Sequence, residues 1–144
     1  MQCRGSWAKA LAPCRDVECD FLAKGRNDAV EVRTHANSRG WCWWGDVFGR
    51  LAQEVPRELR QGCFFPVTRY SKAMLSAVEA ELGLITGFCE VYFPTLCVGR
   101  GLTYAAMPAA CFDVFRFAPN VDLAYMETPA KPDTLCHPVK INRD

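Results

Sequence analysis

Residues 63–83 read CFFPVTRYSKAMLSAVEAELG, and this stretch decides the fold class because a strand signal runs directly into a helix signal. Cys63 to Tyr70 is rich in aromatic and β-branched residues, which favour a strand despite Pro66. Ser71 is a typical helix N-cap, and Gly83 is a typical residue just past a helix end. The apolar face of this helix is expected to hold Met74, Leu75, Val78 and Leu82, with Glu79 and Glu81 away from it.

Strand and helix signals also lie on both sides of this stretch, and together they predict a mixed α/β sequence of elements. Before it we expect a helix over 6–12, strands over 20–23 and 30–32, and a helix over 51–60 that Pro56 interrupts. After it we expect a helical segment from Gly87 that Pro94 kinks or restarts, strands over 102–106 and 114–117, and a Pro-containing tail. No internal repeat is visible, so a single domain over 1–144 is the simplest partition.

Composition and charge exclude some classes of function. Seventeen Lys and Arg against sixteen Asp and Glu leave a formal net charge of +1, so no nucleic acid partner is expected. No apolar run approaches the roughly 18 residues of a spanning helix, and the first ten residues lack the pattern of a signal peptide. No membrane segment is therefore expected in this chain. An anchor upstream of it stays open, and so does the compartment.

Nine cysteines are many for this length, but their number is odd and their spacing is scattered. They stand at positions 3, 14, 19, 42, 63, 89, 97, 111 and 136. This does not resemble a disulfide framework, and the paired spacing of a zinc site is absent. Most are expected to be reduced residues of the core.

Four motifs in this order resemble a group of glycosyltransferase-like proteins, most of them uncharacterised, that have a GT-A-like fold. They are the W-x-W-W loop at Trp41–Trp44, Arg69-Tyr70-Ser71, Gly87-x-x-Glu90 followed by Pro94-Thr95, and His137-Pro138-Val139-Lys140. The resemblance covers about Gly5 to Lys140. It implies a mixed-sheet α/β fold with flanking helices, which would be the C-terminal, acceptor-side part of a nucleotide-diphospho-sugar transferase-like domain.

The resemblance also implies a nucleotide-sugar donor, a glycan or other hydroxyl acceptor, and a divalent metal, Mn or Mg. In such proteins an Asp-x-Asp-like motif that holds the metal precedes a segment similar to Arg4-Gly5-Ser6-Trp7. This chain begins at Met1, so it lacks room for that motif. Glu18-Cys19-Asp20 has suitable letters, but its position favours an ordinary strand edge.

The resemblance assigns catalytic and diphosphate roles to three residues. Glu90 would be the base that takes the proton of the acceptor hydroxyl, a role that a positioned carboxylate can fill. A carboxylate that merely stabilises a helix start is the competing interpretation. His137 would ligate the metal or contact the diphosphate, and Lys140 would add positive charge there. A His-Pro surface turn is the plainer alternative for that motif.

Further candidates would bind the substrate. Trp41, Trp43 and Trp44 offer flat faces on which a sugar or nucleobase stacks. Because a strand alternates its faces, we expect Trp41 and Trp43 to share one side and Trp44 to point to the other, with one of the two sides in the core. Arg69 could clasp a phosphate or form an ordinary ion pair, and Asp46 could bind sugar hydroxyls or only form a turn with Gly45.

Three hypotheses follow from the sequence. The first is a glycosyltransferase that uses Glu90 as its base. The second is a non-catalytic derivative of that fold that binds glycan or a protein partner, which the lack of acidic metal ligands favours. The third is a truncated chain whose isolated fold is marginal.

Overall fold

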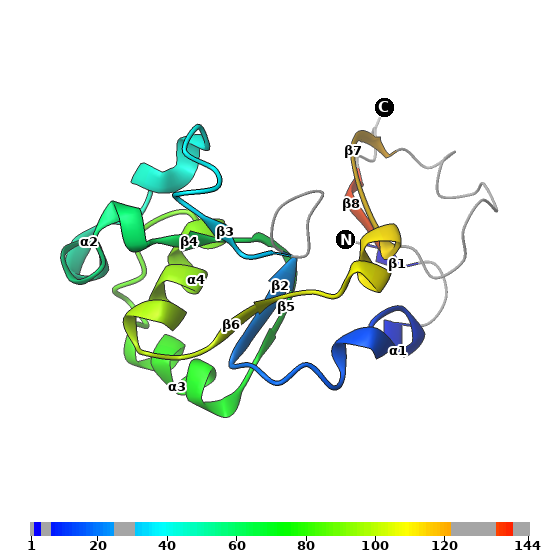
Figure 1. Ribbon diagram of the computed structural model, residues 1–144, viewed down its shortest axis with the longest axis horizontal. Helices are drawn as coiled ribbons and strands as arrows, with labels where there is room; N and C mark the ends of the chain where they lie inside the picture. Colours follow the sequence, from blue (N-terminus) through cyan, green and yellow to red (C-terminus); the bar gives the residue numbers. More distant parts are fainter. Residues whose placement is uncertain (1, 4–6, 25–30, 122–134, 140–144) are drawn as a thin grey trace. The chain divides into compact units, whose positions relative to one another are not determined.

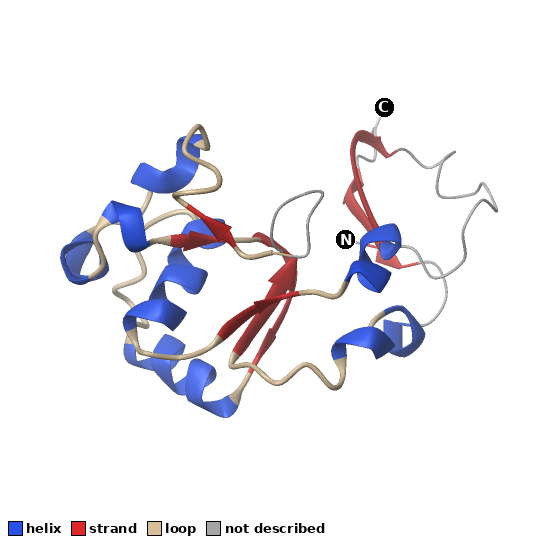
Figure 2. Ribbon diagram, viewed as in Figure 1, coloured by secondary structure: helices blue, strands red, loops and turns tan. Residues whose placement is uncertain are grey.

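The computed structural model describes residues 2–3, 7–24, 31–121 and 135–139. The chain divides into two compact units, Met1–Asp16 with Pro108–Asp144 (unit 1) and Val17–Met107 (unit 2). Both units contain helices and strands (Figure 2), so the predicted α/β class is confirmed. We describe each unit by itself. The single domain over 1–144 stays a prediction.

Unit 2 is built on a three-stranded mixed sheet. Its central strand β2 (Phe21–Lys24) pairs antiparallel with β5 (Phe64–Tyr70) and parallel with β6 (Tyr104–Ala106). Phe21 lies opposite both Tyr70 and Tyr104, with ring centroids 5.3 and 5.1 Å away. Every residue of β2 is buried, as expected for the middle strand of a covered sheet. The strands predicted over 20–23, 63–70 and 102–106 are therefore present.

Three helices accompany this sheet, and α4 is the central one. It spans Cys89–Gly99 and packs against α2 (Gly49–Glu54), α3 (Lys72–Ala80) and β5, with α3 and α4 on one face of the sheet (Figure 1). Pro94 lies inside α4 and is buried, so the helix continues through it. The hydrophobic core lies among these elements and contains Phe21, Ala23, Trp44, Val47, Leu51, Val55, Cys63, Met74, Val91, Tyr92, Leu96 and Cys97.

Helix α3 confirms the predicted start, ends at Ala80 and so earlier than predicted, and corrects the predicted faces. The Met74 backbone N–H donates to Ser71 Oγ at 3.1 Å, and Gly83 has a φ of 84°. Leu75 and Leu82 are 54% and 67% exposed, whereas Glu81 is 1% exposed. The prediction was wrong for Leu75 because, of the neighbours Met74 and Leu75, only Met74 points inward. It was wrong for Glu81 and Leu82 because the helix ends at Ala80. Residues after Ala80 no longer follow the helical period.

Other local predictions shift by a few residues. A short helix over Arg57–Leu59 (η3) follows Pro56, so the interruption expected in 51–60 is present. Glu31 and Val32 form no strand; β3 instead spans Arg33–Thr34 and pairs with β4 (Gln61–Gly62). Two-residue strands depend on a distant partner, so periodicity does not reveal them.

Unit 1 contains a second three-stranded sheet in the order β1-β8-β7. Strand β8 (Leu135–Val139) runs parallel to β7 (Phe115–Val121) and antiparallel to β1 (Gln2–Cys3). The expected tail therefore holds a strand. The described part of this unit also contains helix α1 (Trp7–Ala10) and the 3-10 helices η1 (Ala12–Cys14) and η4 (Ala109–Val114).

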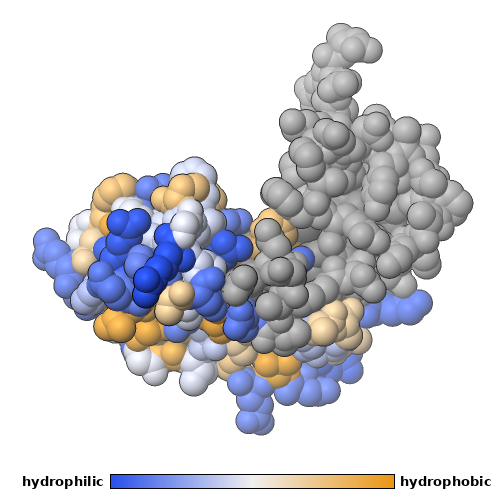
Figure 3. Space-filling model, turned by 45° about the horizontal axis from the view of Figure 1, so that its top comes forward, coloured by the Kyte–Doolittle hydropathy of each residue, from blue (hydrophilic) through white to orange (hydrophobic). Residues whose placement is uncertain are grey.

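The surface of the described residues mixes polar and apolar areas. In Figure 3 the apolar areas in view lie among polar ones. The exposed large apolar side chains are Trp43, Phe48, Leu59, Leu75, Leu82 and Leu84. Within the described ranges, no helix has both the length and the apolarity needed to cross a bilayer.

Candidate functional site

The tryptophan loop is a short 3-10 helix, η2 (Cys42–Gly45), and not an extended segment. Because that helix has about three residues per turn, Trp41 and Trp44 lie on the same side, and their rings meet edge to face at 4.8 Å. Trp44 is fully buried, whereas Trp43 is 39% exposed. The alternation that paired Trp41 with Trp43 was therefore wrong. Trp43 is the tryptophan of this loop that presents most surface to a ligand.

Two hydrogen bonds hold the buried tryptophan in place. The Trp44 indole N–H donates to the Ser38 carbonyl at 2.7 Å, and the Arg60 guanidinium donates to the Trp44 carbonyl at 2.7 Å. Burial lowers the pKa of Arg60, which is 7% exposed and also donates to the Val55 carbonyl. Sequence reasoning missed Arg60 because nothing local marks its distant backbone acceptors. These contacts fix Trp44 beneath the loop.

Glu90 lies in the first turn of α4 and is half-buried. The N-cap position, Phe88, provides no side-chain cap, so an acidic residue is favoured in this turn by the helix dipole. The Cys63 backbone N–H donates to the Glu90 carbonyl at 2.8 Å, which fixes the helix start on the beginning of β5. The predicted position of Glu90 near a helix start is confirmed.

Backbone contacts join the tryptophan loop to the start of α4. The Phe88 N–H donates to the Asp46 carbonyl at 2.9 Å, and the Trp43 ring lies on the Phe88 ring at 4.4 Å and 31°. Gly87 has a φ of 141°, and a Cβ added there would lie 2.2 Å from the Asp46 carbonyl oxygen. Only glycine fits this approach. Trp43 and Asp46 are therefore brought next to the segment that presents Glu90.

Arg33 is a member of this region that the sequence did not indicate. Its guanidinium carbon lies 4.5 Å from the centre of the Trp41 ring, a cation–π arrangement. The Trp41 ring covers Gly62, where an added Cβ would come within 2.5 Å of the ring. The next residue, Cys63, donates its backbone N–H to the Glu90 carbonyl. Glu90, Arg33, Trp41, Trp43 and Asp46 form what we call the Glu90 site.

Two opposite charges act on the buried Cys63 thiol. Burial raises the pKa of the Cys63 thiol well above its usual value; the negative charge of Glu90 raises it further, and the positive charge of Arg33 opposes this. In strand β4, directly before Cys63, the Gln61 Oε1 atom is buried without a hydrogen-bond partner among the described residues. A buried polar atom of this kind calls for an explanation, and a bound polar group would supply one.

Arg69 lies at the far end of β5 from the Glu90 site. It pairs with Leu22 across the sheet, six residues beyond Cys63, which corresponds to about 20 Å of extended chain. Its guanidinium donates to the Val17 carbonyl and to Cys19 Sγ, at 3.4 Å for the sulfur. These contacts give Arg69 a structural use in holding the chain that leads into β2. Its predicted phosphate contact stays a prediction.

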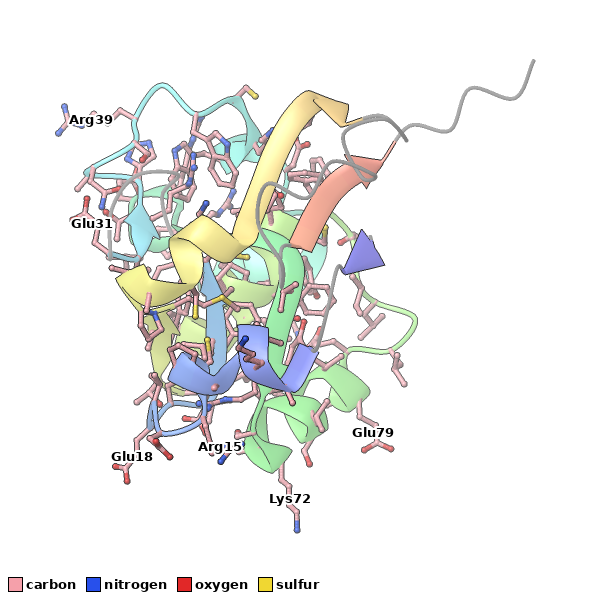
Figure 4. The ribbon with its side chains drawn as sticks, turned by 90° about the vertical axis from the view of Figure 1, so that its right-hand side faces the viewer. Arg15, Glu18, Glu31, Arg39, Lys72 and Glu79 are labelled. Carbon is pink, nitrogen blue, oxygen red and sulfur yellow. The ribbon has the colours of Figure 1, made fainter. Side chains whose placement is uncertain are left out.

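Within the Glu18-Cys19-Asp20 motif, Asp20 links three chain segments by hydrogen bonds to Ser71 and Thr103. The Asp20 carboxylate accepts from the Thr103 backbone N–H and hydroxyl, both at 2.9 Å, and from Ser71 Oγ at 2.8 Å. These hydrogen bonds, that of the Thr103 N–H first, lower the pKa of Asp20. Glu18 is exposed and points away from the molecule (Figure 4). The expectation of a strand edge fits this geometry.

Glu81 is a buried carboxylate that the sequence placed on the solvent side. It accepts hydrogen bonds from Arg50 and from Arg100, the latter at 2.7 Å, and the Tyr92 hydroxyl lies 3.5 Å away. Burial works against its ionisation, but the hydrogen bonds from Arg100 and Arg50 prevail and lower the pKa of Glu81. Two arginines compensate its charge, so this cluster stabilises the packing of α2, α3 and α4.

The predicted diphosphate contacts belong to unit 1. His137 is the third residue of β8 and lies opposite Phe117 of β7, so the His-Pro motif is in a strand and not in a turn. Lys140 lies outside the described residues. Among the residues that the structure describes, no three His, Cys, Asp or Glu side chains gather as a metal site. The roles of His137 and Lys140 stay predictions.

Comparison of the chain with family models, with characterised protein sequences and with solved structures yields no match.

Proposed function

We propose that the chain is a glycosyltransferase-like protein in which Glu90 accepts the proton of an acceptor hydroxyl. The observation that carries this proposal is the placement of Glu90: a half-buried carboxylate in the first turn of α4, beside the tryptophan loop. A hydroxyl is a weak nucleophile until a positioned base removes its proton, and a carboxylate at the edge of a ligand platform suits that task.

The reaction proposed at this site is a displacement at the anomeric carbon of a nucleotide-sugar. As Glu90 takes the proton, the acceptor oxygen forms a bond to that carbon. The bond from the carbon to the diphosphate oxygen breaks, and its electrons leave with the nucleoside diphosphate. Trp43, 39% exposed on Phe88, would stack on an apolar sugar face, and Asp46 would accept from sugar hydroxyls.

The donor side of the reaction is proposed from the sequence resemblance. A divalent Mn or Mg ion would offset the charge of the diphosphate, with His137 and Lys140 as its expected neighbours. The described residues do not gather a set of metal ligands, so no step of the proposed reaction is assigned to a metal.

The test is turnover by the full chain with a panel of nucleotide-sugars, with Mn or Mg and a mixture of sugar acceptors. Nucleoside diphosphate release is measured for the wild type, Glu90→Gln and Glu79→Gln. Glu79 lies on α3, is exposed and points outward (Figure 4), so Glu79→Gln is the matched control. Loss of the base should lower kcat about 100-fold or more. Full activity in Glu90→Gln overturns the assignment.

A non-catalytic glycan-binding protein is the second candidate, favoured by the exposed Trp43 on its Phe88 support. This candidate predicts glycan binding without turnover. Trp43→Ala should weaken binding about tenfold, whereas Glu90→Gln should leave it unchanged, as titration calorimetry with glycans would measure. Nucleoside diphosphate release by the wild type would reject it.

A further inference from the structure

Unit 1 contains a close pair of thiols from two distant parts of the chain. Cys14 ends η1 and Cys111 lies in η4, and their Sγ atoms are 3.2 Å apart although 97 positions separate the residues. Both are buried: Cys14 is 6% exposed and Cys111 is 0% exposed. A disulfide bond brings the two sulfurs to about 2.05 Å, so a further approach of about 1.2 Å would close one.

The backbone around each thiol is held by short-range hydrogen bonds. The Cys14 N–H donates to the Leu11 carbonyl at 2.9 Å, and the Cys111 N–H donates to the Pro108 carbonyl at 2.9 Å. Helices η1 and η4 pack against each other within unit 1. The two side chains therefore face each other from anchored turns.

Other described thiols lie in different surroundings. Cys42 is exposed on the tryptophan loop, and Cys19 contacts the guanidinium of Arg69. Cys63 is buried beside the Glu90 carbonyl. An odd and scattered set of cysteines does not form a disulfide framework, but it leaves room for one specific pair.

We propose that Cys14 and Cys111 form an intrachain disulfide by exchange with a low-molecular-weight disulfide such as oxidised glutathione. The Cys14 thiolate attacks one sulfur of oxidised glutathione, the glutathione S–S bond breaks, and one glutathione thiolate leaves. Cys111 then loses its proton and attacks the Cys14 sulfur of the mixed disulfide, which releases the second glutathione. Two electrons pass from the protein thiols to glutathione disulfide, and each released glutathione takes up one proton.

Burial of the two thiols determines when the exchange takes place. In the folded unit, burial, followed by the hydrogen bond with Cys14, raises the pKa of the Cys111 thiol to about 12, so Cys111 is protonated while the two thiols lie together. Because both thiols are buried, exchange takes place before unit 1 closes or when η1 opens. Native packing then retains the product.

The consequence of this bond is specific to unit 1. It joins Met1–Asp16 to Pro108–Asp144, two segments of the same unit that are separated in sequence by all of unit 2. A link that closes so long a loop restricts the unfolded chain strongly. The stability of unit 1 therefore depends on the redox state of its surroundings, whatever activity the Glu90 site has.

The test is a disulfide map of the full chain, unfolded and refolded in buffers with defined ratios of reduced to oxidised glutathione. Remaining thiols are blocked by alkylation, and the chain is digested without reduction and analysed by mass spectrometry. We expect a cross-linked peptide pair that contains Cys14 and Cys111 and that disappears on reduction. Alkylation of both thiols after oxidised refolding, or pairing of Cys14 with another cysteine, overturns the proposal.

Thermal unfolding supplies a second readout. Oxidation should raise the Tm of the wild type by about 5 °C or more. The exposed Cys42→Ser variant should keep this shift, and Cys14→Ser should lose it. If Cys14→Ser does not fold, the map of the wild type still decides. An equal shift in Cys14→Ser means that another bond causes the effect, and it contradicts the proposal.

Discussion

Gly87 shows how one residue connects the tryptophan loop to the Glu90 helix. Its φ of 141° lies in the range that favours glycine, and its Cα faces the Asp46 carbonyl too closely for any side chain. The sequence placed Gly87 at the start of a helical segment, which is correct. The contact with Asp46 was not predictable, because it depends on how two segments about forty residues apart meet.

Gly87→Ala should destabilise the protein by about 2 to 4 kcal/mol, because a Cβ 2.2 Å from the Asp46 oxygen forces the two segments apart. Chemical denaturation monitored by circular dichroism measures this. Gly40→Ala is the control, since an added Cβ there meets nothing within 4 Å and no positive φ is involved. Equal stabilities of the two variants would contradict the described approach.

The Glu81 cluster makes stability depend on pH at the acid end. Its folded-state pKa lies below the ordinary value of 4.5, so the unfolded chain binds a proton first as pH falls. The stabilisation is complete above about pH 4.5 and is lost as pH falls through the lower folded-state pKa. We expect the free energy of unfolding to decrease in that window.

Glu81→Gln should remove this contribution to the pH dependence and cost about 1 to 3 kcal/mol at neutral pH, because it removes the buried carboxylate that binds both Arg50 and Arg100 and leaves them paired with the more exposed Glu54. Urea unfolding at pH 3.5 to 7 measures both effects. Glu79→Gln on the exposed side of α3 should change stability by less than about 0.5 kcal/mol. An unaltered pH profile in Glu81→Gln would show that the cluster does not set it.

At the scale of elements, local sequence signals predicted the helices and strands whose formation depends mainly on their own residues. The strand Phe64–Tyr70 and the helix Lys72–Ala80 carry their own propensity, cap and stop, so both were found from the sequence. The 3-10 form of the tryptophan loop was missed because its shape depends on Arg60 and Ser38, which lie outside it. Strand β8 was missed because its partners β1 and β7 are far away in sequence.

The cap of α3 offers a test at this scale. Ser71→Ala removes the acceptor for the Met74 N–H and should cost about 1 kcal/mol of stability through the lost cap. Ser76→Ala, an exposed position within the same helix, should be neutral or slightly stabilising because alanine favours helices. Guanidinium denaturation compares the two variants. A loss of stability in Ser76→Ala as large as that in Ser71→Ala would show that the Ser71 cap does not cause the effect.

At the scale of the whole molecule, the two units relate differently to the predicted site. Four predicted residues, Glu90, Trp41, Trp43 and Asp46, lie on segments of unit 2 that contact one another, and Arg33 lies over Trp41. Trp44 supports them from the core. His137 belongs to unit 1. The sequence could suggest the members through their motifs, but Arg33 and the opposed charges around Cys63 arise only from tertiary packing.

The pH dependence of kcat/KM for nucleoside diphosphate release, measured for the wild type, Glu79→Gln and Glu90→Gln, tests the role of Glu90 most directly. A base must be ionised to accept a proton, so the rate should fall about tenfold per pH unit once the pH is low enough to protonate the carboxylate. We predict this acid limb in the wild type and in Glu79→Gln, and a slow rate without that limb in Glu90→Gln. The same limb and the same rate in Glu90→Gln would contradict the account.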